Sequence, residues 1–140
     1  MIFLDTNVLI AAVLATHPHH LQSRSLLLRS KGVEITIAAH TLAELYSGLT
    51  RIPPPERVSA AVAMQAIEAY LERMTLITLT AKEYLDTVRE TARGGHIGGM
   101  IYDALLLACA RKVNPERIYT WNLKHFKSIA PDLADRMITP

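Results

Sequence analysis

The sequence has little of what marks secreted, membrane-bound or highly charged proteins. Its single cysteine, Cys109, excludes an internal disulfide and fits a reducing compartment. No apolar stretch approaches the roughly 20 residues that a membrane-spanning helix needs. The N-terminus lacks a basic region, and Asp5 interrupts the first apolar run, so we expect no secretory signal. These absences predict a cytoplasmic protein without a membrane contact.

An excess of charge is also missing, since 15 basic residues against 13 acidic ones leave a net charge of +2. A balance this mild does not by itself indicate a nucleic-acid binder. Residues 111–127 are more basic and leave two interpretations open, a solvated surface or an edge that contacts phosphates. Their charged or titratable side chains are one acid, Glu116, and the basic residues Arg111, Lys112, Arg117, Lys124, His125 and Lys127.

What is present is the composition of an ordinary globular protein, with 50% apolar and 20% charged residues. A length of 140 residues without repeats or linkers predicts one domain over residues 1–140. Short apolar runs alternate with helical patterns, which predicts a three-layer α/β fold with a mostly parallel sheet of four to five strands flanked by helices. We expect strands at 1–4, 33–37, 75–79, 117–120 and 137–139, and helices at 6–15, 21–29, 40–50, 56–73, 81–92 and 100–112.

Acids that lie just past a strand are the candidate site residues, because ligands of such sheets bind at the carboxyl ends of the strands. Asp5 directly follows the apolar run MIFL. Taken alone, it is better explained as a helix N-cap, whose side-chain oxygen accepts a backbone N–H. Glu44, in HTLAELYSGL at 40–49, is taken alone a solvated residue, because helical spacing turns it away from the leucines. Its helix nevertheless begins just after the second strand, where Glu44 could meet Asp5.

Asp103 is the only charged residue of MIYDALLLACA, residues 100–110. A helix that is apolar on nearly all sides is largely buried. A buried carboxylate without a partner must shift its pKa, pair with a base or bind a cation. The nearest base along the chain, Arg111, is about two helical turns away. We therefore favour a metal-binding or catalytic role for Asp103 over a neutral or distantly paired aspartate.

The segment YTWNLKHF, residues 119–126, follows the fourth predicted strand. Thr120 and Asn122 offer neutral oxygens that can bind a hard cation directly or through water. Trp121 and Phe126 are expected to pack in the core rather than to stack on nucleic-acid bases. The segment therefore adds polar ligands to the same edge of the sheet as the acids.

Several carboxylates in one cleft repel one another unless a cation lies among them. Oxygen ligands of this kind select Mg²⁺ or Mn²⁺ over zinc. Such a metal activates water and offsets the charge of a phosphate, so the constellation predicts metal-assisted phosphodiester hydrolysis. A phosphoacceptor receiver domain also gathers acids at strand ends, but a paired acid motif after the first strand and a strand-end Lys are absent here.

Four stretches resemble the motifs of PIN domains in their order and spacing, and the resemblance covers nearly the whole chain. They are FLDTNVLI at 3–10, LAELYSGL at 42–49, GGMIYDALLLACA at 98–110 and YTWNLKHF at 119–126. Among PIN domains, the compact single-domain chain looks most like a VapC-type toxin. By this resemblance, Asp5, Glu44 and Asp103 match the acidic metal-binding positions, and Thr120 matches the hydroxyl of the last motif. Thr6 and Asn7 match the polar residues beside the first acid.

The resemblance implies a Mg²⁺-dependent endoribonuclease, with Mn²⁺ as a substitute, that is the toxin of a type II toxin–antitoxin pair and cleaves tRNA or rRNA. It also implies a homodimer that a VapB-type antitoxin holds inactive, with DNA contacted only through the complex with the antitoxin. The alternative is a degenerate PIN domain that binds RNA or protein without catalysis. We assign the catalytic site to Asp5, Glu44, Asp103, Thr120 and Asn122.

One position departs from the family pattern. Asn122 stands where many members carry a fourth acid. An asparagine keeps an oxygen ligand but loses the charge, which weakens a second metal site. We therefore expect one firmly held Mg²⁺, with a second ion arriving only with the substrate phosphate.

Overall fold

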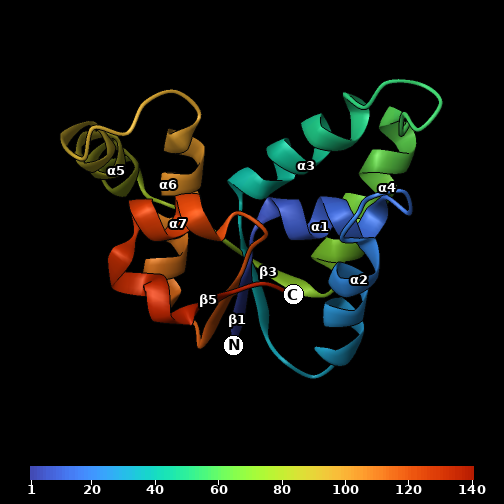
Figure 1. The fold of residues 1–140 in the computed structure, drawn as a ribbon, viewed down its shortest axis with the longest axis horizontal. Helices are drawn as coiled ribbons and strands as arrows, with labels where there is room; N and C mark the ends of the chain where they lie inside the picture. Colours follow the sequence, from blue (N-terminus) through green and yellow to red (C-terminus); the bar gives the residue numbers. More distant parts are fainter.

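The computed structural model describes residues 1–140 and has a five-stranded parallel sheet between two layers of helices (Figure 1). The strand order is β3-β2-β1-β4-β5, so the first strand is the central one. All four pairings are parallel. This confirms the predicted α/β fold. The strands are β1 (Ile2–Leu4), β2 (Ile35–Ala38), β3 (Met74–Ile77), β4 (Arg117–Tyr119) and β5 (Met137–Ile138).

The helices divide between the two faces of the sheet (Figure 1). Helices α1 to α4 cover one face, and α5 to α7 cover the other. None of these helices combines the length and the apolarity that crossing a membrane requires. The bounds are α1 (Thr6–Val13), α2 (His20–Arg29), α3 (His40–Thr50), α4 (Ala60–Leu71), α5 (Ala81–Arg93), α6 (Met100–Val113), α7 (Leu123–Ile129) and a short 3₁₀ helix, η1 (Pro131–Arg136).

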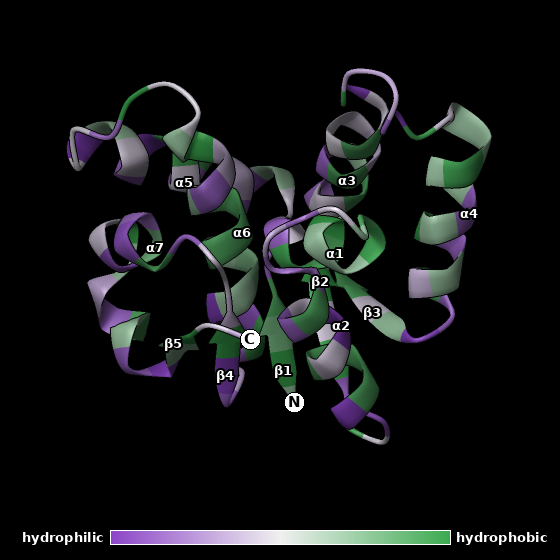
Figure 2. Cartoon of the chain, turned by 45° about the vertical axis from the view of Figure 1, so that its right-hand side comes forward, coloured by the Kyte–Doolittle hydropathy of each residue, from purple (hydrophilic) through white to green (hydrophobic).

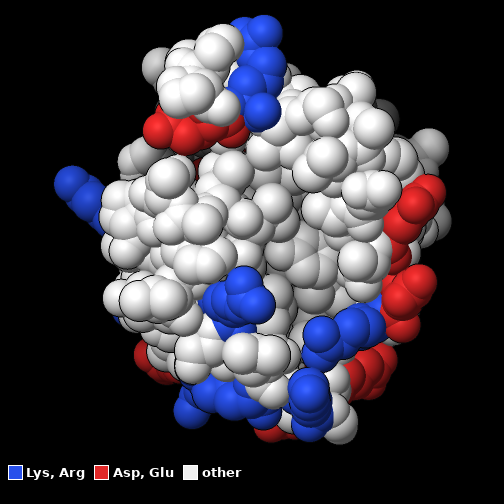
Figure 3. All heavy atoms as spheres, turned by 90° about the vertical axis from the view of Figure 1, so that its right-hand side faces the viewer, with Lys and Arg blue, Asp and Glu red and all other residues white.

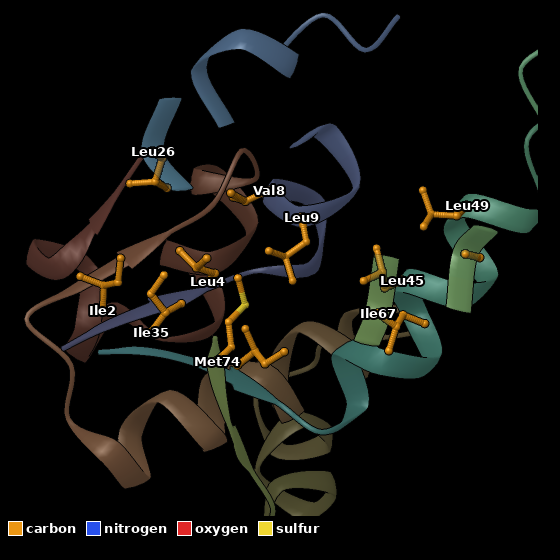
Figure 4. Packing of buried hydrophobic residues seen from close by; sticks show 12 residues of the cluster. Ile2, Leu4, Val8, Leu9, Leu26, Ile35, Leu45, Leu49, Ile67 and Met74 are labelled. Carbon is orange, nitrogen blue, oxygen red and sulfur yellow. The ribbon is translucent and has the colours of Figure 1, made fainter. Parts of the chain in front are cut away.

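Strand β1 supplies side chains to a hydrophobic core on each side of the sheet. Alternate residues of a strand point to opposite faces, so Leu4 packs in the core under α1 to α4 and Phe3 packs in the core under α6 and α7. Figure 4 shows the first core, in which Leu45 of α3 lies close to Ile67 of α4. In Figure 2 β1 is hydrophobic throughout, while the helices around it mix hydrophobic and hydrophilic residues. Burial of each large apolar side chain contributes about 1.5–3 kcal/mol, so both cores hold β1 in place.

Several predicted boundaries were wrong by a few residues. The helix predicted at 56–73 begins only at Ala60, because Ser59 caps it and accepts the N–H of Val62 at 3.2 Å. The second strand begins at Ile35 rather than at Val33, which is exposed. No helix was predicted after residue 112, whereas α7 and η1 fill most of the segment between β4 and β5.

The site is positioned at the carboxyl end of the central strands. Helix α1 begins directly after β1, and α3 begins at His40, two residues after β2. Leu4 pairs in register with Tyr119 of β4, and the N–H of Asp5 donates to the carbonyl oxygen of Tyr119 at 3.0 Å. Residues that follow β1, β2 and β4 therefore meet at one edge of the sheet.

Candidate active site

A cavity of about 540 Å³ opens where α1, α3 and α6 meet beyond the end of β1. Its lining includes Asp5, Glu44 and Asp103. The structure thus brings together three acids that lie far apart in the sequence and on different helices or strand ends. It also places Thr120 and Asn122 in hydrogen-bond contact with two of them.

The Asp5 carboxylate is only 4% exposed and is held by Thr120, a fully buried residue. The Thr120 hydroxyl donates to Asp5 Oδ2 at 2.6 Å. The same hydroxyl oxygen accepts the backbone N–H of Asn122 at 2.9 Å, which fixes its orientation. Asp5 stands at the N-cap of α1, but its side chain makes no capping hydrogen bond. The prediction that Asp5 stands at the N-cap is confirmed in position, but capping does not account for its carboxylate, which Thr120 holds.

The two polar residues after Asp5 connect the strand ends to one another. The Thr6 hydroxyl donates to Glu44 Oε2 at 2.7 Å, which ties α3 to the start of α1. Asn7 Oδ1 accepts the backbone N–H of Trp121 at 3.2 Å. The half-buried Glu44 is therefore a residue of the cavity wall with a fixed partner, and the solvated alternative is wrong.

Asp103 lies in the first turn of α6 and is half-buried, whereas the sequence pattern indicated a largely buried residue. The buried stretch of α6 begins one residue later, at Ala104. Asn122 Nδ2 lies 3.4 Å from Asp103 Oδ2 and 3.2 Å from His125 Nδ1. The neighbours of Asp103 therefore come from the segment after β4, about 20 residues further along the chain.

Burial and the neighbouring charges disfavour the charged forms of Asp5 and Asp103. The pKa of Asp5 rises from its usual 3.8 to about 7, mainly because of burial and also because of the charges of Asp103 and Glu44, while the hydrogen bond from Thr120 lowers it in part. Burial, followed by the charge of Glu44, raises the pKa of Asp103 to about 6, and His125 lowers it in part. None of the three acids forms a salt bridge. The acids of the cavity therefore lie without an ion-pair partner.

The donor chemistry fits a hard divalent cation. Carboxylate oxygens predominate, the amide of Asn122 is close by, and no cysteine faces the cavity. As they stand, no three His, Cys, Asp or Glu side chains are close enough together to enclose a metal ion. A bound cation would offset the repulsion that raises the pKa values of Asp5 and Asp103.

His40, Arg51 and Tyr102 are among the cavity residues that were not recognised from the sequence. His40 and Arg51 share a face of α3 with Glu44, at spacings of four and seven residues, and Tyr102 precedes Asp103. Helical spacing from the two acids was the signal that could have identified them. Trp121 packs against the core and donates to Ser23 at 2.9 Å, which confirms that it is a packing residue.

Comparison with known proteins agrees with this geometry. A family model described as PIN domain matches residues 2–130. Ribonuclease VapC40 of Mycobacterium tuberculosis is 36% identical over 106 residues, which cover 76% of this chain and 75% of that protein. Fold and sequence together define a PIN domain, and the chain belongs to the PIN-domain family.

Two solved structures of VapC proteins share the fold. The M. tuberculosis toxin VapC20, described as cleaving the sarcin–ricin loop, superimposes with a TM-score of 0.74 at 21% identity and covers 89% of this chain and 92% of its own. VapBC2 from Rickettsia felis, bound to a DNA fragment from its promoter, matches with a TM-score of 0.61 at 29% identity and 92% and 93% coverage. The chain is thus similar in fold to VapC proteins.

The raised pKa of Asp5 predicts how the metal-free protein responds to pH. Because the pKa is higher in the folded chain than in the unfolded one, this group favours folding most at pH values below about 4 and loses that contribution as the pH rises through about 7. Asp5→Asn removes the titration. Between about pH 5 and pH 8, the free energy of unfolding of the wild type should fall by about 2 kcal/mol or more relative to the variant.

Chemical denaturation in the presence of a chelator measures this difference. Asp135→Asn, at an exposed position outside the cavity, is the matched control and should follow the wild type. If the difference in free energy of unfolding between wild type and Asp5→Asn stayed constant across the pH range, the raised pKa of Asp5 would be contradicted.

Proposed function

We propose that the chain is a Mg²⁺-dependent endoribonuclease and the toxin of a type II toxin–antitoxin pair. The observation that carries the proposal is the cavity in which Asp5, Glu44 and Asp103 lie together without a cationic partner. Unbalanced carboxylates beyond the carboxyl ends of parallel strands are suited to hold a divalent cation. The similarity to Ribonuclease VapC40 supports RNA as the substrate.

Asp5, Glu44 and Asp103 would hold the ion, and Mn²⁺ would substitute for Mg²⁺. When bound there, Mg²⁺ supplies an activated water and offsets the charge of the phosphate. Thr120 and Thr6 are positioning residues, because their hydroxyls donate to Asp5 and Glu44 and leave the remaining carboxylate oxygens available. Asn122 orients Asp103 through its amide and adds no charge to the site.

A structured RNA, either a tRNA or an rRNA, is the substrate class that we propose. VapC20, whose fold is similar, is described as a toxin that cleaves the sarcin–ricin loop. Proteins recognise RNA mainly at unpaired nucleotides in loops and bulges. The phosphodiester bond of such a nucleotide can enter a cavity of this size.

A VapB-type antitoxin is the proposed partner, and the similarity in fold to the VapBC2 pair of R. felis supports it. That pair is bound to a DNA fragment from its promoter. Contact with DNA would then pass through the antitoxin. The face formed by α2 and α4 is suited to a protein partner, since Figure 3 shows mostly uncharged side chains in its middle, with Lys, Arg, Asp and Glu around the edges. Exposed apolar side chains of these two helices include Leu21, Leu28, Val62 and Met64.

A second copy of the chain is the proposed partner of α5. Tyr84, Leu85 and Val88 form an exposed apolar stripe on this helix. The buried side of α5 is made by Thr87 and Thr91, whose hydroxyls donate to the helix's own backbone. A helix that turns its threonines inward and its larger apolar residues outward is suited to pack against another subunit.

The nuclease proposal predicts that Asp103→Ala abolishes cleavage while the protein stays folded. The rate should fall by more than about a hundredfold, since loss of the partners that merely orient metal ligands already costs about 10–100-fold. The stability should be equal or higher, because the substitution removes a charge that Glu44 repels. The purified chain is incubated with total cellular RNA in Mg²⁺ and in a chelator, and new 5′ ends are mapped.

Asp135→Ala, at an exposed position, serves as the control and should cleave like the wild type. Equal loss of RNA with Mg²⁺ and with the chelator would count against metal dependence. No cleavage in either tube would favour the non-catalytic binding module.

Replacing the neutral Asn122 by a charged residue should change how the stability of the protein responds to metal. Asn122→Asp places a carboxylate where an amide nitrogen now lies 3.4 Å from Asp103 Oδ2. In chelator, the melting temperature should fall by a few degrees, equivalent to about 1 kcal/mol. Added Mn²⁺ should raise it by more than in the wild type, because a further charged ligand is present.

Thermal melts over a Mn²⁺ titration, together with a count of bound ions, measure both effects. Two tightly bound ions in the wild type without RNA would show that Asn122 does not limit the site to one metal.

The α5 stripe predicts that Leu85→Asp converts a dimer to a monomer. Leu85 is 48% exposed, so the monomer itself should stay folded. Light scattering after size-exclusion chromatography gives the mass. Leu21→Asp, on α2, is the matched control and should remain dimeric, and a wild type that is monomeric at all concentrations would refute the proposal.

A further inference from the structure

One wall of the cavity is formed by one face of helix α3 along its whole length. His40, Glu44, Ser47 and Arg51 follow one another along α3 and its C-terminal cap, and all of them line the cavity. The eleven steps from His40 to Arg51 span roughly 17 Å at 1.5 Å per residue. An aromatic ring therefore lies at one end of the wall, a carboxylate near the middle and a guanidinium at the other end. An extended chain of a few linked units fits this arrangement better than a single small molecule.

The aromatic end is a stacked pair of rings from two helices. The His40 ring of α3 lies 5.3 Å from the Tyr102 ring of α6, with 12° between their planes. Tyr102 is 49% exposed, so part of its ring stays open to solvent inside the lining of the cavity. Neither side chain makes a hydrogen bond in the structure. His40 lies one turn before Glu44, and Tyr102 directly precedes Asp103, so the open ring adjoins the acids.

The basic end is a guanidinium without an internal partner. Arg51 is exposed, forms no salt bridge and donates no side-chain hydrogen bond. It is the only lysine or arginine that lines the cavity, although three carboxylates line it as well. A guanidinium binds phosphate oxygens with two parallel hydrogen bonds, and none of its donors is occupied here.

We propose that the α3 wall is a track for single-stranded RNA. An unpaired base stacks on the open ring of Tyr102, and Arg51 binds a phosphate further along the chain. The RNA backbone between these two contacts then crosses the cavity past Glu44. This inference rests on the proposed nuclease function and names the substrate-binding residues of the same cavity. A base must leave its helix to stack on a side chain, so the track selects unpaired nucleotides.

The simpler explanation of the ring pair is a clamp that holds α6 against α3. A clamp affects all ligands of the cavity alike, whereas a base platform affects only ligands that carry bases. The two probes are therefore labelled oligoadenylate and a ribose–phosphate chain of the same length that lacks bases. Binding is followed by fluorescence anisotropy in Mg²⁺. All variants are made in an Asp5→Asn background, so that RNA is not consumed.

Tyr102→Ala and Tyr102→Leu should weaken binding of oligoadenylate about tenfold and leave the chain without bases unchanged. Tyr102→Phe should retain the affinity of the starting protein, because it keeps the ring. Arg51→Gln should weaken both probes equally and reduce the dependence of affinity on salt by about one phosphate contact. Tyr46→Ala on α3 and Arg24→Gln on α2, both at exposed positions outside the cavity, are the matched controls.

Equal losses for both probes in Tyr102→Ala and Tyr102→Leu, or no loss in either, would overturn the base platform. Failure of the background protein to bind oligoadenylate, together with cleavage of RNA by the wild type, would overturn the track but leave the nuclease proposal intact. Base-dependent binding through Tyr102 without any cleavage by the wild type would support the track and refute the nuclease.

Discussion

The hydrogen bond from the Thr120 hydroxyl to the Asp5 carboxylate, 2.6 Å long and fully enclosed, is the contact on which the site depends. It joins the first turn after β1 to the first turn after β4, across 115 positions of sequence. The orientation of Thr120 is set in turn by the N–H of Asn122, and Asn122 approaches Asp103. A single hydroxyl therefore links the central acid to the segment that orients the acid of α6.

The fold keeps three carboxylates in one cavity although each charge disfavours the others. Burial, together with the charges of Asp103 and Glu44, raises the pKa of Asp5 to about 7. The two cores that enclose β1 supply the free energy that tolerates this repulsion, since Phe3 and Leu4 are both fully buried on opposite faces. The site thus lowers the stability of the fold as long as no cation is bound. Active sites commonly reduce stability in this way. The exposed ring of Tyr102 and the unpaired Arg51 extend the same cavity towards a substrate.

How far the sequence predicted the fold and the site depended on how local each feature is. The first strand and the three acids could be predicted, because an apolar run that ends in Asp5 and a lone charge in an apolar helix are patterns within a few residues. The burial of Asp103 was overestimated, because helical periodicity does not show that its turn borders a cavity. Helix α7 was missed because LKHFKSI is short and half polar. The N-cap position of Asp5 was predicted, but local preference could not show that Thr120 donates to its carboxylate.

By itself, the sequence determined the order of the strands and of helices α1 to α6, and the residue types that can bind a hard cation. These follow from spacing and chemistry along the chain. Only the tertiary structure decided that β1 lies between β2 and β4, and this strand order brings Asp5, Glu44, Asp103 and Thr120 to one edge of the sheet. It also decided that His40 and Tyr102 stack, because they lie on different helices that are far apart along the chain. Pairing between strands is a contact across the whole chain, and no local pattern encodes it.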